Sequence, residues 1–399
     1  MTGMLPVALD GIRVLEVGHI MAAPFCGLLL ADMGADVIKV ESPDGGDGMR
    51  RMGPPFFNGI AGGFLILNRN KRSIALDLKS AEGLALMHRL LAEADILVEN
   101  YRPGALDSLG LGYDEVHRRH PALIYCSITG FGRTGPYAGR GGFDLIAQGM
   151  SGLMSITGHP GSPPAKVGVP ICDLNAGLFA AYGIVAAYIH RLRTGQGQHL
   201  DMALLDAGIA YTIWEAAEYF GGSVPQPTGS AHRSIAPYQA LRVRDGFVNV
   251  GAATQRNWQR FCQVIGREDL LEDQRFLTNA DRVGHRDELA TILEASLLEH
   301  DTAYWLERLE AAGVPAGPIY DVAQVLADPQ VLARQMLIET DHPTAGRVMS
   351  LGSPLKLSET PAGVRRPAPA LGQHTPEILR DMGVSDEEVG QLRESGVVR

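Results

Sequence analysis

Apolar positions in the first half of the chain alternate between short β-rich runs and longer stretches with helical spacing. The pattern predicts strands at 12–18, 36–42, 95–101 and 122–129 and helices at 24–34 and 80–94. Another strand is expected in "SIALDL", after the basic residues that end at Arg72. Repeated strand–helix–strand order implies an α/β fold with a parallel sheet covered by helices.

The composition changes after residue 220. The segment "GGSVPQPTGSAHRS" (221–234) is rich in Gly, Pro and Ser and predicts a linker, whereas 197–220 before it predicts a strand that continues as one long helix. Beyond the linker, 238–252 predicts a strand pair that turns at Asp245-Gly246, followed by helices over 255–310.

The last part of the chain is expected to return to the first domain and to end in a short helix, 376–382, and a charged tail. A length of 399 residues favours two domains over one ordinary core. The predicted division is a large α/β domain, 1–220 and 321–399, joined through the linker to a smaller α+β domain, 235–320.

A single carboxylate, Asp173, stands in the uncharged stretch around "VGVPICDLNAG". The next segment, "LFAAYGIVAAYIHRL", has no charge before His190 and Arg191 and predicts a buried helix. An acid at this position is either an N-cap that accepts hydrogen bonds from free N–H groups, or a nucleophile or base held by those groups. These residues alone leave both interpretations open.

Charge and composition narrow the classes of function. The balance of 35 basic and 45 acidic residues gives a net charge of −10, which offers no general attraction to nucleic acid or to an anionic membrane. The N-terminal residues lack a signal-peptide pattern, and no apolar run reaches the ~18 residues of a membrane span. A cytoplasmic protein is expected.

Several common motifs are absent or out of context. "GFGRTG" (130–135) follows a strand but is followed by Pro136 and loop-like residues, so it predicts a flexible loop and not a nucleotide fingerprint. Four dispersed cysteines suggest neither a disulfide framework nor a metal site. Cys172 adjoins Asp173, but its surroundings favour a small core residue over a thiol nucleophile.

Basic residues gather in "LNRNKRSIALDL" (67–78), at Arg69, Lys71 and Arg72. They are either a solvated turn or a clamp for phosphate groups, for which Arg and Lys supply charge and donors.

The blocks "LDGIRVLEVGHIMAAPFCGLLLADMGADVIKVESPDGGD", "LNRNKRSIALDLKS", "VENYRPGALDSLGLGYDEV" and "VGVPICDLNAG" resemble the family III CoA-transferases, the CaiB/BaiF family, and the resemblance runs in order along essentially the whole chain. It implies a Rossmann-like large domain and a transferase of sulfur-containing groups. By this resemblance Asp173 falls on the family's catalytic aspartate, which attacks an acyl-CoA and then carries CoA as an aspartyl thioester. Coenzyme A is thus expected as a substrate, without a tightly bound cofactor or metal.

The resemblance also implies residues that contact CoA: His19, Met21, Ala22, Asn68, Arg69, Asn70, Lys71, Asn100, Tyr101, Arg102 and Arg140. Two serines, Ser42 and Ser108, stand where some members carry arginine, and Met21 stands where the oxalate-handling branch carries glutamine. The sequence most resembles the succinyl-CoA:glutarate (hydroxymethylglutarate) branch of the family, so succinyl-CoA and a dicarboxylate are the expected substrates. Arg233 in the linker could pair with a distal carboxylate.

Two alternatives remain. An α-methylacyl-CoA racemase needs two acid/base groups, and the racemase branch has histidine where this chain has Phe143. A non-catalytic CoA-binding protein would have no need of Asp173. The family's subunits interlock, so the resemblance further implies an interlocked homodimer, with no nucleic-acid or membrane partner.

Overall fold

The structure is a computed structural model that describes residues 7–399, which form two compact units. The first unit holds the described residues up to Met154 together with Lys166–Phe220 and Pro329–Arg399, and the second holds Ser155–Ala165 and Gly221–Asp328. Compactness does not show that either unit folds by itself, so the predicted domain limits stay predictions.

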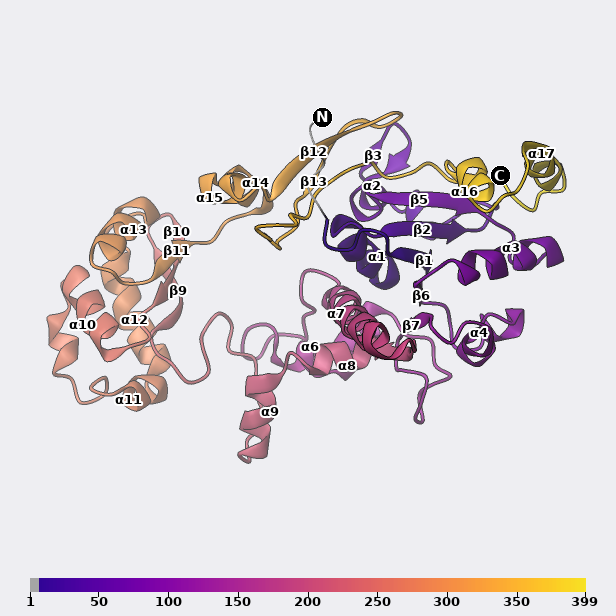
Figure 1. Cartoon of the computed structure of the whole chain (residues 1–399). Helices are drawn as coiled ribbons and strands as arrows, with labels where there is room; N and C mark the ends of the chain where they lie inside the picture. The colour runs from indigo at the N-terminus through magenta and orange to yellow at the C-terminus, as the bar shows by residue number, and fades with distance from the viewer. Residues whose placement is uncertain (1–6) are drawn as a thin grey trace. The chain divides into compact units, whose positions relative to one another are not determined.

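A six-stranded sheet in the order β5-β2-β1-β6-β7-β8 is the centre of the first unit (Figure 1). All neighbouring strands are parallel. The strands are β1 (Arg13–Val17), β2 (Asp36–Glu41), β5 (Lys71–Ala75), β6 (Ile96–Glu99), β7 (Ile124–Thr129) and β8 (His199–Ala203). Counted along the chain, this order is 3-2-1-4-5-6, that of the Rossmann fold. The predicted α/β fold with a parallel sheet is confirmed.

Helices cover both faces of this sheet. The α-helices of the first unit, of which α6 ends in the second unit and not all cover the sheet, are α1 (Ala22–Asp32), α2 (Gly62–Leu67), α3 (Ala81–Ala92), α4 (Tyr113–Arg119), α5 (Asp144–Met150), α6 (Leu153–Ile156), α7 (Ile171–Thr194), α8 (Leu204–Ile209), α9 (Ile213–Phe220), α15 (Pro329–Ala333), α16 (Thr375–Asp381) and α17 (Asp386–Glu394). On one face α3, α4, α16 and α17 share an apolar core with the strands. On the other, α7 packs against α1, β7 and β8.

Two predicted segments differ from the structure. The single long helix expected within 197–220 is two helices, α8 and α9, because the Thr212 hydroxyl and N–H both donate to the Ile209 carbonyl and close a turn between them. The expected charged tail contains α17, which begins with a capping box between Ser385 and Glu388. The predicted helix 376–382 corresponds to α16.

The second unit combines a three-stranded antiparallel sheet with helices, so the predicted α+β architecture is confirmed. The sheet has the order β11-β10-β9. The strands are β9 (Tyr238–Val243), β10 (Gly246–Gly251) and β11 (Ala316–Pro318), and the helices of the unit are α10 (Gln255–Val264), α11 (Asn279–Gly284), α12 (Arg286–Leu297), α13 (Thr302–Ala311), α14 (Val322–Ala327) and the 3₁₀ helix η3 (Glu268–Leu271). Trp258 and Phe261 lie in the apolar core of the second unit.

Small elements of the first unit are η1 (Gly48–Arg51), η2 (Asp107–Leu109) and the hairpins β3 (Phe56–Phe57) with β4 (Ile60–Ala61) and β12 (Leu337–His342) with β13 (Gly346–Leu351).

The long helix α7 was predicted to be buried, and this is only half right. Its buried face carries small residues, including Ala176, Gly177 and Ala180, which allow close packing against α1. Its other face exposes large apolar side chains, with Tyr182 at 74% and Leu192 at 71%. Within residues 7–399 it is the one helix long and apolar enough to cross a membrane, a property that core helices of other proteins share.

Candidate active site

A cavity of about 230 Å³ opens at the carboxyl ends of four neighbouring strands. Segments that follow β1, β6, β7 and β8 supply its walls together with the start of α7. The strand order changes direction between β1 and β6: the chain proceeds from β1 to β2 and β5 on one side, and from β6 to β7 and β8 on the other. Doubly wound sheets bind their ligands in the crevice at this point. The lining residues are His19, Ile20, Met21, Ala22, Asn100, Tyr101, Arg102, Pro103, Ile128, Thr129, Gly130, Arg140, Gly141, Gly142, Phe143, Asp173 and Leu204.

Asp173 reaches this cavity from the first turn of α7. The helix begins at Ile171 with Pro170 at the N-cap position and no side-chain cap hydrogen bond from that residue. Asp173 is therefore the third helical residue, and the interpretation of Asp173 as the helix cap is wrong. The cap comes from Asp144 of α5, whose Oδ1 accepts the N–H of Cys172 at 2.9 Å and that of Asp173 at 3.4 Å.

This environment changes the acidity of Asp173. Burial, followed by the nearby charge of Asp144, raises the pKa of Asp173 to about 7. A carboxylate of higher basicity is a better nucleophile, and at neutral pH a large fraction of it is ionised. The raised pKa of Asp173, together with its place in the cavity wall, favours a reactive carboxylate over a structural one.

Asp144 is itself fixed in place. Its Oδ2 accepts a hydrogen bond from Gln148 Nε2 at 2.7 Å, and the fully buried Gln148 also accepts the N–H of Val167 at 2.9 Å. Sequence reasoning considered Phe143 but missed Asp144. The signal was an acid at the start of an apolar helix, but only the fold brings it to Asp173.

The turn after β1 is tied to the end of β6. Asn100 Oδ1 accepts the His19 N–H at 2.8 Å, and Asn100 Nδ2 donates to the His19 carbonyl at 2.9 Å. The Tyr101 ring meets the His19 imidazole edge-on, with centroids 4.8 Å apart. Burial lowers the pKa of His19, so a neutral imidazole faces the cavity at pH 7.

Two arginines bring positive charge to the same cavity. Arg140 lies over the Tyr137 ring at 4.2 Å, on a loop whose ends meet at Gly130 and Gly142. A Cβ on Gly130 would lie 2.5 Å from the Gly142 Cα, so only glycine permits this closure. Neither Arg102 nor Arg140 forms an ion pair with any residue in 7–399, which leaves both guanidinium groups able to bind an anion.

The cavity brings together eight residues expected from the sequence: Asp173, His19, Met21, Ala22, Asn100, Tyr101, Arg102 and Arg140. The other four, Asn68, Arg69, Asn70 and Lys71, do not line it, and their side chains are buried.

The side chains of those four residues form hydrogen bonds or ion pairs with other groups of the protein. Arg69 pairs with Asp32, with Nη2 2.6 Å from Oδ2, and Asn70 donates to the same carboxylate. Lys71 Nζ lies 2.9 Å from Asn68 Oδ1 and 2.7 Å from Glu16 Oε2. CoA contact by these four residues stays a prediction, and their observed contacts are structural.

The thiol of Cys172, next to Asp173, is a poor candidate for the nucleophile. Cys172 is fully buried, and burial, together with Asp144, raises the pKa of its thiol to about 11. Over the described range 7–399 no three His, Cys, Asp or Glu side chains are grouped so as to hold a metal ion. Asp173 is thus the candidate nucleophile of the cavity.

The fold and the cavity define a doubly wound α/β protein with a carboxylate of raised pKa in its ligand crevice. Residues 9–375 match the family model described as CoA-transferase family III. The chain belongs to this family, and the resemblance found in its motifs is confirmed.

Named relatives agree with this assignment. The chain is 42% identical to a succinate–glutarate CoA-transferase of Agrobacterium fabrum, over 94% of this chain and 95% of the relative. It is 40% identical to the succinyl-CoA:glutarate CoA-transferase of Homo sapiens, over 98% and 90% of the two chains. A solved structure of a CaiB/BaiF family protein from Brucella suis is 42% identical with a TM-score of 0.85, covering 94% of this chain and 99% of the other. The protein is therefore a CoA-transferase that acts on CoA thioesters.

Proposed function

We propose that the protein transfers CoA from succinyl-CoA to a dicarboxylic acid through a covalent intermediate on Asp173. The observation that carries the proposal is a carboxyl group with a pKa of about 7 that lines the crevice beside two arginines. The named activities of the relatives support the choice of donor and acceptor.

The first half-reaction loads the enzyme. An ionised Asp173 oxygen attacks the succinyl thioester carbonyl, the C–S bond breaks, and a mixed anhydride and a CoA thiolate form. The thiolate then attacks the Asp173 carbonyl carbon, which gives an aspartyl-CoA thioester and releases succinate. The succinate leaves with one oxygen that belonged to Asp173.

The second half-reaction reverses these steps with a new acid. A carboxylate oxygen of the acceptor attacks the aspartyl thioester and expels CoA thiolate, and a second mixed anhydride forms. The thiolate attacks the acceptor's acyl carbon, so the acceptor leaves as its CoA thioester. Asp173 is restored with one oxygen from the acceptor, and no proton has to be added or removed in the net transfer.

We place CoA along the carboxyl edge of the sheet. A second cavity of about 130 Å³ lies beside the ends of β2 and β5, lined by Ser42, Asp77, Lys79 and others, and Tyr101 lines both cavities. A CoA whose thioester reaches Asp173 can therefore extend past Tyr101 toward β5. Arg102 and Arg140 are then the proposed anion partners near the thioester, for a phosphate of CoA or for a carboxylate.

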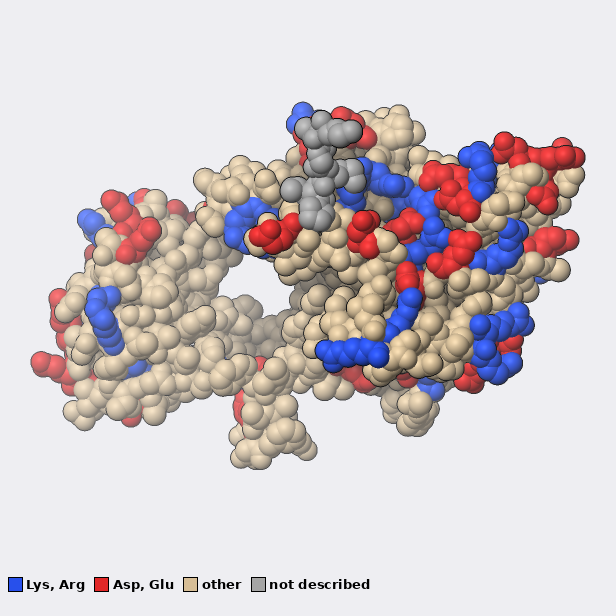
Figure 2. Space-filling model, viewed as in Figure 1, with Lys and Arg blue, Asp and Glu red and all other residues tan. Residues whose placement is uncertain are grey.

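We also propose that the protein is a cytoplasmic homodimer. The exposed apolar face of α7 and the protruding α9 support a second copy as partner. Helix α9 exposes Ile213, Trp214 and Phe220 and also carries Glu215 and Glu218. It appears as a projection that is mostly tan with a little red (Figure 2). Light scattering after size exclusion should give twice the chain mass, and Tyr182→Arg should shift it toward one chain mass. A wild-type monomer at micromolar concentration would contradict the dimer.

Assays with succinyl-CoA and a panel of acids test the proposed reaction. Glutarate and related dicarboxylates should accept CoA, and monocarboxylates should accept it poorly. A racemase would instead exchange the α-proton of an acyl-CoA with deuterated solvent, and a non-catalytic protein would do neither. Exchange without transfer would overturn the proposal.

A further inference from the structure

The turn between β1 and α1 contains a residue in an unfavourable backbone conformation. Ile20 has φ of 64°, in the left-handed region, where a β-branched residue is a rare outlier. Among the non-glycine residues with positive φ in 7–399, Ile20 is the β-branched one. An unrestrained isoleucine would populate this conformation roughly ten- to a hundredfold less than its alternatives. Surrounding groups must therefore hold it.

Asp47 supplies the direct restraint. Its Oδ1 accepts the N–H of Ile20 at 3.0 Å and that of Met49 at 2.9 Å. The Asp47 side chain is fully buried, and its own N–H donates to Glu41 Oε2 at 3.0 Å. The carboxylate that holds the Ile20 N–H is thus itself held by the Met49 N–H, and the backbone of Asp47 is held by Glu41.

Lys39 ties Asp47 to the beginning of the same turn. Its Nζ lies 2.9 Å from Asp47 Oδ2, 2.9 Å from the Gly18 carbonyl and 2.7 Å from Glu16 Oε1. Lys71 binds the other oxygen of Glu16 at 2.7 Å. We call Glu16, Lys39, Asp47 and Lys71 the charge cluster; none of its four side chains is exposed to solvent.

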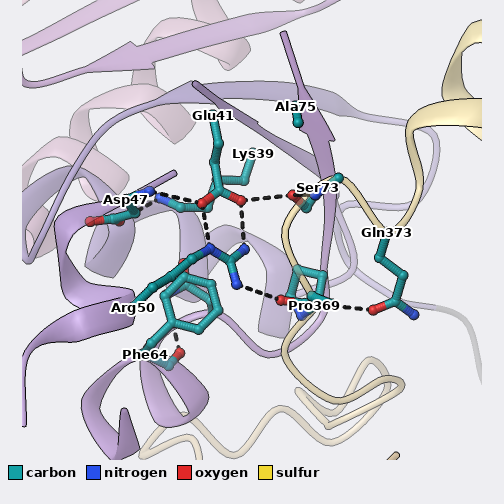
Figure 3. A network of polar contacts seen from close by, with 12 residues as sticks. Lys39, Glu41, Asp47, Arg50, Phe64, Ser73, Ala75, Pro369 and Gln373 are labelled. Atoms are coloured by element: carbon teal, nitrogen blue, oxygen red, sulfur yellow. Dashed lines mark hydrogen bonds and ion pairs between the residues drawn. The ribbon is translucent and has the colours of Figure 1, made fainter. Parts of the chain in front are cut away.

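A second layer of polar contacts supports this cluster (Figure 3). Glu41 accepts two hydrogen bonds from Arg50, at 2.8 and 2.6 Å, and one from the Ser73 hydroxyl at 2.7 Å. The Arg50 guanidinium lies 3.8 Å from the centre of the Phe64 ring. Neither Glu41 nor Asp47 can therefore shift without breaking several contacts.

The strained turn is a wall of the Asp173 cavity, since His19, Ile20 and Met21 all line it. Burial of ionised pairs is a poor way to gain stability compared with apolar packing. Fixed geometry at a reacting centre, in contrast, is worth large factors in rate. We propose that Asp47 and Lys39 are positioning residues that hold Ile20 left-handed and thereby set His19 and Met21 against the bound acyl-CoA. This inference rests on the proposed function.

The test combines Asp47→Ala with two substitutions of Ile20. Both Ile20→Ala and Ile20→Gly shorten the side chain that lines the cavity, but only glycine adopts positive φ without penalty. We expect Asp47→Ala to lower kcat for CoA transfer by about tenfold to a hundredfold in the wild-type and Ile20→Ala backgrounds. In the Ile20→Gly background the loss should be several-fold smaller, with KM for succinyl-CoA little changed in each comparison.

An equal loss of kcat in all three backgrounds would overturn the inference, because a merely structural Asp47 has no reason to depend on the φ preference of residue 20. If Asp47→Ala does not fold, Asp47→Asn replaces it in the same three backgrounds. It keeps an acceptor for Ile20 but loses the charge that binds Lys39, so the same pattern is expected with smaller losses. A wild type without CoA transfer would contradict the proposed function, and a wild type that transfers CoA with equal losses would contradict this inference alone.

Discussion

Two regions of the first unit contain charged side chains that differ in their exposure and in their ion-pair partners. In the active-site cavity, Asp173 and Arg140 face an open space. In the charge cluster, Lys71 and its partners are fully enclosed, and each lysine lies within 3 Å of an acid. A buried charge that is matched by a neighbour holds the backbone in place, whereas an accessible charge without an ion-pair partner can meet a ligand.

The difference between the two regions lies in burial, which the sequence alone does not reveal for basic residues. Lys71 and Arg140 look alike along the chain, as basic residues near glycine, asparagine or other loop-forming residues. Strand pairing separates them: Lys71 lies in β5 opposite Val37 of β2, while Arg140 lies on a loop beyond β7. Burial follows from this pairing and cannot be read from the residue type.

The largest expected effect concerns Asp173. Asp173→Asn should abolish CoA transfer by a factor of at least about 10³, because an amide is a very poor nucleophile. Circular dichroism should show an unchanged fold, since Asp144 and not Asp173 caps α7. Cys172→Ser is the matched control and should keep activity. Substantial transfer by Asp173→Asn would contradict the mechanism.

For Lys71 of the charge cluster the largest expected effect is on stability. Lys71→Met leaves Glu16 with one cationic partner and should lower the free energy of unfolding by about 3–5 kcal/mol. Arg140→Met, an exposed counterpart, should change it by less than about 0.5 kcal/mol. Urea denaturation of the two variants measures both values. Equal stabilities would erase the distinction between the two regions.

Removal of the accessible charge should instead change substrate binding. Arg140→Ala should raise KM for succinyl-CoA by about tenfold, the loss of one charge-assisted contact, with the increase smaller at high salt. Lys71→Met tests the CoA contact predicted for Lys71: because its Nζ is fully buried against Glu16, KM should be nearly unchanged in the folded fraction. A rise in KM for the acid alone would assign Arg140 to the acceptor and not to CoA.

The smallest expected effect is a shift of a pH profile. The pKa of Asp173 is raised to about 7, so kcat/KM should fall below pH 7 as the nucleophile becomes protonated. Asp144→Asn removes one of the two causes of this rise but keeps an acceptor for the α7 N–H groups, so the acid limb should move to lower pH.

The raised pKa also affects stability. Ionisation of Asp173 is disfavoured in the folded state, so its contribution to stability is present below pH 3.8 and is lost as pH rises through about 7. Asp173→Asn lacks this loss and should be at least as stable as the wild type at pH 8. A less stable variant at that pH would contradict the assigned environment of Asp173.

Much of the fold was predictable because its signals are local. The strand–helix alternation and the Ser80 cap of α3 follow from short stretches of sequence. The active site was predictable where residues follow strand ends, as His19 and Asn100 do. The contact of Asp144 with α7 and the strained Ile20 depend on segments far apart in the chain. A local pattern marks Asp144 as an acid at a helix start, but it does not show which residues Asp144 contacts.

Oxygen transfer in a single turnover tests the central claim most directly. Excess enzyme is mixed with unlabelled succinyl-CoA and an acceptor acid whose carboxylates carry ¹⁸O. If Asp173 carries CoA, the released succinate contains no label, because its new oxygen comes from Asp173, and one ¹⁸O atom appears in the peptide that contains Asp173. Direct attack of the acceptor on succinyl-CoA would place the label in succinate and none in Asp173, and that result would contradict the account.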